Sequence, residues 1–302
     1  MSFQFLSSMN KPPIVAAVGA VIAGGFPLIP ALPIGVLQVA NVIAFATNVA
    51  AVSVPGRLDG EQDQKMRQGD VNPESSPLVS GPSDPLALRQ RTLVLPAGWA
   101  FSIWGPIYLG EATFCVAQFI DSTNLAASLP QATVPFVAAN LLQALWCASF
   151  RPSFNEGWHK YVSCAMLGGT AYALSFIPAD QSWYYLPMAV HFGWTTAATL
   201  VNVNGSMAMS RNVSDTALVA AGHSSAVLAT LLGVGVTVFE WSTPAYGLTV
   251  AWALAAVANG IKVERHERDW TPALQSGARV QKTLCWIGSA ICASTAAFYL
   301  LQ

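Results

Sequence analysis

Long apolar runs separated by short polar segments dominate the chain. A run of about 20 apolar residues is long enough to cross the hydrocarbon core of a bilayer as a helix. Eight runs meet this description, at residues 34–54, 97–120, 133–150, 160–178, 184–206, 219–239, 245–261 and 282–301. The pattern therefore predicts an all-α protein, a polytopic transmembrane helix bundle with about eight spans.

A further apolar stretch, from Ile14 to Ile29, precedes the first span and is separated from it by prolines. Three interpretations stay open: a ninth helix, a re-entrant or interfacial segment, or part of a removed targeting peptide. Lys11 is the only basic residue before the stretch and no Ala-x-Ala site is obvious, which argues against a cleaved signal. Residues 1–33 are therefore treated as a separate N-terminal segment.

Composition changes the picture from helical to membrane-embedded. Hydrophobic residues make up 53% of the 302 residues and charged residues only 10%, whereas soluble domains carry about a quarter charged residues. The chain cannot cover a water-facing surface with so few charges. We expect a multi-pass integral membrane protein surrounded by lipid, in a membrane that the sequence leaves open, with no nucleic-acid partner.

The basic residues orient the predicted bundle. Apart from Lys11, they lie in alternate connections, whereas the connections near Asp121, Asp180 and Glu240 contain none. By the positive-inside rule the basic connections face the cytoplasm or its organellar equivalent, so eight spans place both termini on the other side. The longest basic connection, residues 55–92, is polar and rich in Pro and Ser. It is predicted to be a flexible loop, with a regulatory or partner-binding insert as the alternative.

Polar and aromatic side chains recur at helical spacing in four of the first five predicted spans. Polar groups at bilayer depth are costly, so they usually face the protein interior. Spacings of three, four and seven residues place each set on one helix face. The four sets are Gln38, Asn41, Phe45 and Asn48; Trp104, Tyr108, Glu111, Cys115 and Gln118; Asn140, Gln143 and Cys147; and Pro187, His191, Trp194, Ala198 and Asn202.

Two ionisable groups stand out among them. Glu111 is the only acid well inside a predicted span, and His191 is the only histidine at comparable depth. Helical rise places both residues a few positions toward the non-cytoplasmic side of antiparallel helices. We hypothesise that they line one cavity and interact directly or through water. A polar pair that only ties helices together, and a proton-coupled pathway, are the alternatives.

The remaining chemistry is sparse. The five cysteines all lie in predicted spans without metal-ligand spacing, so buried small side chains are expected and no metal site is assigned. The sequence contains no nucleophile triad and no phosphate-binding glycine loop. Catalytic residues are therefore not assigned, and whether the protein is an enzyme stays open.

Three motifs resemble the tryptophan-rich sensory protein and translocator protein family (TspO/MBR, or peripheral benzodiazepine receptor). They are the Pro- and Trp-rich start of the second span from Pro96 to Tyr108, the segment from Asn140 to Trp146, and the segment from Leu186 to Asn202. The motifs occur in the family's order, and the resemblance covers about residues 34–206. The chain is most similar to longer variants with extra C-terminal helices.

The resemblance implies a five-helix bundle over residues 34–206, with a ligand pocket closed by the loop 55–92, and three additional helices over 207–302. It implies a sensor or carrier that binds a hydrophobic aromatic small molecule such as a porphyrin or another tetrapyrrole. A porphyrin or haem is thus a candidate ligand, not a required cofactor. A secondary transporter or a structural subunit of a membrane complex is the alternative, and a homodimer stays open. The pocket residues implied in this way are Trp104, Tyr108, Asn140, Trp146, Trp194 and Asn202.

Overall fold

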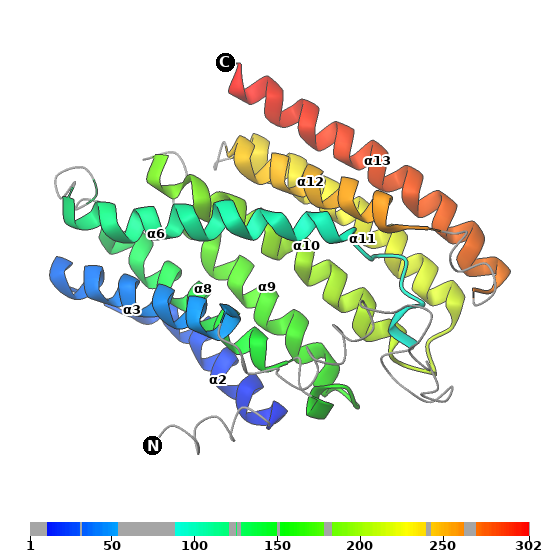
Figure 1. The fold of residues 1–302 in the computed structure, drawn as a ribbon, viewed down its shortest axis with the longest axis horizontal. Coiled ribbons are helices and arrows are strands. Elements are labelled where there is room, and N and C mark those ends of the chain that lie inside the picture. The colour runs from blue at the N-terminus through cyan, green and yellow to red at the C-terminus, as the bar shows by residue number, and fades with distance from the viewer. Residues whose placement is uncertain are drawn as a thin grey trace.

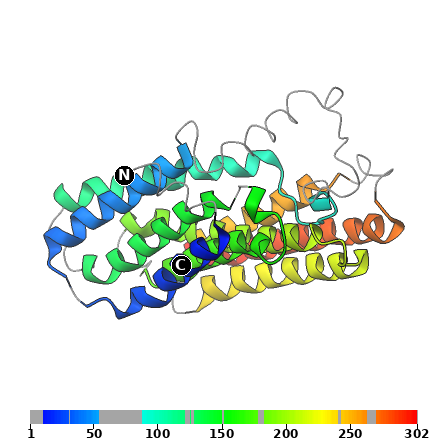
Figure 2. The ribbon, with the colours of Figure 1, turned by 90° about the horizontal axis from the view of Figure 1, so that it is seen from below.

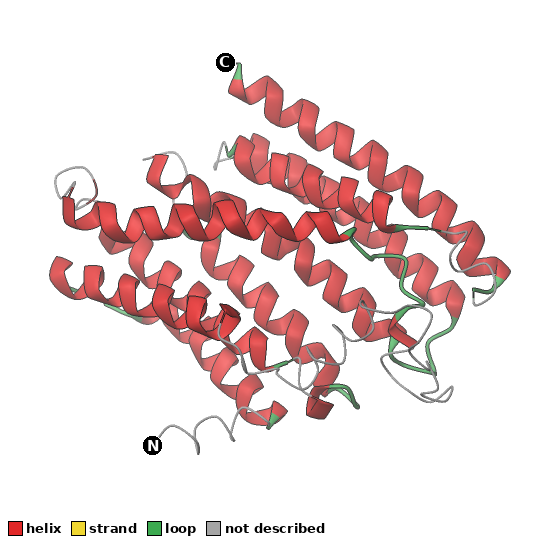
Figure 3. Ribbon diagram, in the orientation of Figure 1, coloured by secondary structure: helices red, strands yellow, loops and turns green. Residues whose placement is uncertain are grey.

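Helices account for all regular structure in the described residues of a computed structural model, and Figure 3 shows these helices joined by loops. The described residues are 11–30, 32–53, 88–120, 125, 128–149, 152–177, 183–239, 243–262 and 270–301. They form α2 (Pro12–Gly25), α3 (Ile34–Ser53), α6 (Trp104–Ile120), α8 (Leu129–Ala148), α9 (Val162–Leu174), α10 (Leu186–Ala208), α11 (Asp215–Val238), α12 (Pro244–Gly260) and α13 (Pro272–Leu300). Short 3-10 turns precede or follow some of them: η1 (Phe26–Leu28), η2 (Gly98–Ile103), η3 (Pro152–Phe154), η4 (His159–Tyr161) and η5 (Trp183–Tyr185). The predicted all-α class is confirmed.

Every predicted span coincides with a helix, and three of these helices are long and apolar enough by themselves to cross a membrane. Within the described residues these candidate spans are Ile34–Val52, Asp215–Val238 and Pro272–Leu300. Helices α8 and α10 are also long, with 20 and 23 residues, but they carry the inward-facing polar side chains that lower their hydropathy. Helix α9 has only 13 residues, shorter than a typical span.

Two helices begin where a capping side chain fixes them. Helix α13 starts at Pro272, ten residues before the predicted span, because Thr271 Oγ1 accepts a hydrogen bond from Leu274 N (3.4 Å) and proline suits the first helical turn. Ser214 Oγ caps α11 in the same way, accepting from Ala217 N at 3.2 Å. The apolar run indicates the part of the helix that can span a membrane, whereas the capping residue determines where the helix begins. The open segment before residue 33 contains helix α2.

Helix α10 occupies the centre of the described bundle, where it packs against α6, α9, α11 and α12. Helices α2 and α3 lie at one edge and α13 at the opposite edge (Figure 1). Seen from below, the helices run roughly along the long axis of the molecule (Figure 2). Side chains that point inward from α6, α8 and α10 therefore meet away from lipid.

The Pro- and Trp-rich segment before α6 is docked on α12. Ala97 N donates to Ala256 O (2.9 Å), and Trp252 Nε1 donates to Ala100 O (3.1 Å). The Trp252 ring also meets the Trp99 ring edge to face at 4.6 Å between centroids. These two hydrogen bonds, one in each direction, and the ring contact hold the segment before α6 against α12.

Gly260 makes this contact possible. A Cβ atom at residue 260 would lie 2.0 Å from Leu95 O and 2.9 Å from Ala97 N, both backbone atoms that cannot rotate away. We therefore expect Gly260→Ala to displace the segment from α12 and to lower the free energy of unfolding by about 1–3 kcal/mol, as overpacking does. Thermal unfolding of the detergent-purified protein, followed by tryptophan fluorescence, measures the change.

Gly235→Ala in α11 is the matched control, since a Cβ there meets nothing within 4 Å. Its helix-propensity gain of at most about 1 kcal/mol should leave the Tm unchanged or slightly raised. Equal Tm values for the two variants would show that the docking on α12 does not contribute to stability.

Candidate functional site

Glu111 and His191 form a direct contact at the centre of the bundle. Glu111 Oε1 lies 2.6 Å from His191 Nδ1, and both side chains are 0% exposed. Glu111 comes from the middle of α6 and His191 from the first half of α10. The structure thus brings together the two ionisable groups that the sequence placed at the same depth.

A close approach of the two backbones makes this contact possible. A Cβ atom on Gly110 would lie 2.1 Å from Pro187 Cγ, so only glycine fits at residue 110 against the proline ring. Pro187 is tolerated there because it occupies the first turn of α10, where no helical hydrogen bond is lost. Gly110 precedes Glu111, and Pro187 lies one helical turn before His191, so the approach positions both members of the pair.

The two groups are each other's partners, but one further polar atom of each side chain has no partner among the described residues. One proton between the two groups gives either an ion pair or a neutral carboxylic acid beside a neutral imidazole, and both arrangements have zero net charge. Burial of a lone charge at this depth would be far more costly. Within the described part of the chain, neither Glu111 Oε2 nor His191 Nε2 has a hydrogen-bond partner. Both atoms remain able to bind a polar group.

Aromatic rings surround the pair. The Trp104 ring stacks on the Tyr108 ring, with centroids 5.4 Å apart and an interplanar angle of 16°. Its edge-to-face contacts reach His191 at 5.5 Å and Trp194 at 6.1 Å. Gln143 Nε2 from α8 donates to the Tyr108 hydroxyl at 2.9 Å and so fixes the orientation of that ring. Trp104 and Tyr108 are half-buried, so the stack connects the pair to the outside of α6.

Asn41, Asn48 and Asn140 belong to a second, separate set of contacts that ties α3 to α6 and α8. Asn48 Nδ2 donates to Asn140 Oδ1 (2.9 Å), and Asn41 Nδ2 donates to Thr133 Oγ1 (3.0 Å) and Gln118 Oε1 (2.9 Å). Each of the α3–α8 bonds joins residues 92 positions apart, so the two helices run parallel. This amide ladder is buried and acts first as a structural tie.

Thr133 and Gln118 are members of the ladder that the sequence did not place in the site. Gln118 lies in the polar stripe of its span, and its Nε2 donates to Gln38 O at 3.0 Å. Thr133 precedes Asn140 by seven residues, two helical turns, and this spacing was the available signal. Threonine alone is too common in apolar helices for the spacing to single it out.

Trp146 and Asn202 lie outside both the aromatic stack and the amide ladder. Trp146 packs beside an apolar cluster that includes Val15 of α2 and Met166 of α9, on another face of α8. Asn202 follows His191 by eleven residues, about 16 Å along α10, and its Nδ2 donates to Ala198 O at 2.9 Å. A stripe on one helix face therefore spans more than one site.

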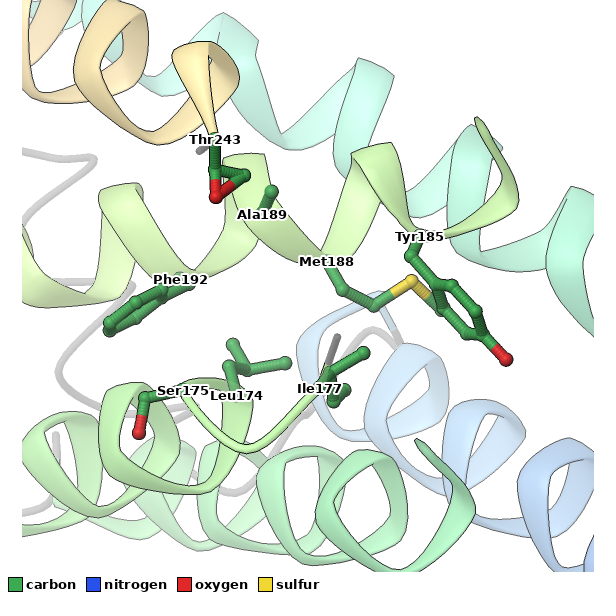
Figure 4. A pocket seen from close by; sticks show the side chains of 8 residues that line it. All are labelled: Leu174, Ser175, Ile177, Tyr185, Met188, Ala189, Phe192 and Thr243. Atoms are coloured by element: carbon green, nitrogen blue, oxygen red, sulfur yellow. The ribbon is translucent and has the colours of Figure 1, made fainter. Parts of the chain in front are cut away.

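A small apolar pocket lies at the opposite end of α10 from Asn202. Figure 4 shows Met188, Ala189 and Phe192 of α10 lining it together with Leu174 and Ile177 from the end of α9. None of its lining residues was a sequence candidate. It lies on the other side of α10 from the aromatic stack, so we do not include it in the candidate site.

The comparison with protein-family models gives a match over residues 83–297 to the family described as "TSPO-like protein". The chain belongs to the TSPO-like protein family. No curated protein and no solved structure matches it. Family membership together with the long apolar helices establishes an integral membrane protein.

The matched range differs in extent from the three motifs. It begins after α3 and runs through α11, α12 and nearly all of α13, so the TSPO-like match includes helices beyond the motif-bearing stretch 34–206. This agrees with the docking of the segment before α6 on α12, which is within the match. In this TSPO-like protein the motif and the later helices form one packed unit.

The direct contact of Glu111 and His191 predicts strong coupling between the two side chains. Glu111→Ala or His191→Ala leaves the other group buried without its partner, and each should lower the free energy of unfolding by about 3 kcal/mol or more. The double variant removes both groups and should cost clearly less than the sum of the single variants. Thermal unfolding of the four proteins in one detergent gives the coupling. Additive losses would show that the two groups do not interact in the membrane-embedded protein.

Proposed function

We propose that this TSPO-like protein is a membrane-embedded binding protein, a sensor or carrier, for a hydrophobic aromatic ligand of the porphyrin or tetrapyrrole class. The observation that carries the proposal is the half-buried Trp104–Tyr108 stack, in which the Trp104 ring contacts His191 of the buried Glu111–His191 pair edge to face. A flat macrocycle has a large π-face, and stacked aromatic rings provide a complementary surface for it.

The polar atoms left open near the stack favour a ligand that donates hydrogen bonds. Glu111 Oε2 and Gln143 Oε1 are buried acceptors without partners in the described residues. Unpaired buried acceptors are costly, so a ligand that satisfies them gains the energy of the bond. A free-base porphyrin has the flat aromatic face that the stack would contact and contains no metal, which is why we choose it as the first probe.

Trp104→Leu removes the stack and should weaken porphyrin binding. In a titration of the detergent-purified protein with a free-base porphyrin, followed by tryptophan fluorescence quenching, we expect a saturable curve for the wild type and about tenfold or more weaker binding for the variant. Loss of one stacked aromatic contact of this kind is worth on the order of 1–3 kcal/mol, and 1.4 kcal/mol is tenfold.

Trp286→Leu is the matched control, because Trp286 is 49% exposed on α13 and is not part of the stack. It should reduce the signal but keep the dissociation constant. Unsaturable quenching of folded wild-type protein, or the same weakening in both variants, would exclude the tetrapyrrole site. The secondary transporter and the structural subunit of a complex would then become the leading functions.

We further propose that α3, α6, α8, α9, α10, α11, α12 and α13 are the eight spans, the first five of them arranged as the five-helix bundle of the family. The support is that each coincides with a predicted span, and that the helices too polar or short to span alone pack against others. The basic connections, including that of Arg211, are proposed to face the cytoplasm.

Labelling of single introduced cysteines tests this topology. All five native cysteines are buried and should give little background. Arg211 is exposed at a basic connection, and Trp183 is 67% exposed at the opposite end. In intact bacterial cells, a membrane-impermeant maleimide should label Trp183→Cys at once and Arg211→Cys only after permeabilisation. Labelling of both without permeabilisation would rule out the arrangement.

A further inference from the structure

A polar pocket lies where α8 and α10 end and α9 begins, away from the aromatic stack. Two of its lining residues are basic, Arg89 and Lys160, and none of them is acidic. The other polar lining residues are Ser149, Asn155, Ser163, Asn202 and Ser206. The pocket therefore combines two positive charges with polar groups. The three serine hydroxyls donate to backbone carbonyls, so the cationic groups and the amides are the donors left for an oxyanion.

Arg89 is the centre of this pocket. Its guanidinium is half-buried against Gly205 of α10, where a Cβ atom would lie 2.9 Å from Arg89 Nε. Among the described residues no hydrogen bond and no ion pair satisfies the guanidinium, although its neighbour Arg91 binds Asp215 Oδ1 at 2.5 Å. Burial lowers the pKa of Arg89 below its ordinary value, because the charged form loses hydration. A half-buried guanidinium of this kind can offer its N–H donors to an anion.

Lys160 adds a second positive charge from the start of α9. Its ammonium donates to Ser210 Oγ and lies 5.7 Å from the centroid of the Tyr161 ring. Ser206 Oγ donates to Lys160 O at 2.7 Å, which holds this residue against the end of α10. An ammonium has three donors, so the hydroxyl contact leaves others for an anion.

The position of the pocket favours a phospholipid head group as the source of the anion. It lies between helix ends at the basic side of the bundle, the side that the positive-inside rule assigns to the cytoplasm. Anionic phospholipids are concentrated in that leaflet, and basic pockets between transmembrane helices bind their head groups. A guanidinium can engage two phosphate oxygens at once, whereas an ammonium acts as a point charge.

We propose that this pocket, formed around Arg89 and Lys160, is a binding site for the phosphate group of an anionic phospholipid. Free inorganic phosphate has the same chemistry and is the other source to be distinguished. The site is independent of the tetrapyrrole proposal, because no residue of the aromatic stack or of the Glu111–His191 pair lines it.

Thermal unfolding in a neutral detergent, titrated with a short-chain phosphatidylinositol phosphate, tests the site. The lipid should raise the Tm of the wild type saturably, and short-chain phosphatidylcholine should not. Arg89→Gln should raise the half-saturating lipid concentration by about tenfold or more, since it removes a charge-assisted pair. Lys160→Gln should raise this concentration by a smaller factor. Inorganic phosphate that gives the same saturable shift and displaces the lipid would identify free phosphate as the ligand.

Arg211→Gln is the matched control, since it removes the same charge from an exposed position near the same helix end. It should leave the half-saturating concentration unchanged. Should Arg89→Gln not fold, Arg89→Lys keeps the charge but loses the planar fork and should show an intermediate affinity. No saturable shift in the wild type, or equal weakening in Arg211→Gln and Arg89→Gln, would overturn the proposal. The second result would leave only diffuse attraction by a basic surface.

Discussion

The contact between α6 and α10 is the constraint on which the rest of the site depends. A proline ring on α10 lies against a glycine on α6, and the approach is so close that residue 110 cannot carry a Cβ atom. The buried Glu111–His191 pair, at 2.6 Å, sits beside this contact. Neither feature is stable without the other, because separated helices would leave two polar groups facing apolar surroundings. The aromatic stack lies beside this pairing of helices, since Trp104 of α6 contacts His191 of α10 edge to face.

Around this contact, most buried side-chain atoms without a hydrogen-bond partner are acceptor oxygens. Four buried oxygen atoms there have no hydrogen-bond partner in the described residues: Glu111 Oε2, Gln143 Oε1, Asn41 Oδ1 and Asn48 Oδ1. The same helices meet lipid with apolar side chains, such as Leu109 and Val116 on the outer face of α6. Polar side chains inside and apolar side chains outside lower the mean hydropathy of a helix, which is why only three helices in the described residues are apolar enough by themselves to cross a membrane.

The helices and the depth of the ionisable pair could be predicted from the sequence, because apolar length and helical rise are local properties. Which candidate residues lie together in one site could not be predicted. Trp146 and Asn140 are six residues apart on α8, yet one faces the cluster with α2 and the other the ladder with α3. Likewise, nothing in the local pattern indicates that Gly260 admits the backbone at Leu95. Such contacts depend on which helix packs beside which, and a single sequence does not contain that pairing.

The parallel amide ladder has a consequence for how this protein tolerates change in length. Its two bonds between α3 and α8 lie two turns apart on both helices and share one offset. Each residue of an α-helix turns it by about 100°. A single insertion between Asn41 and Asn48 would therefore rotate the second amide away from Asn140 while the first stayed in place. A point substitution changes one contact of this interface, whereas an insertion or deletion changes every contact that follows it.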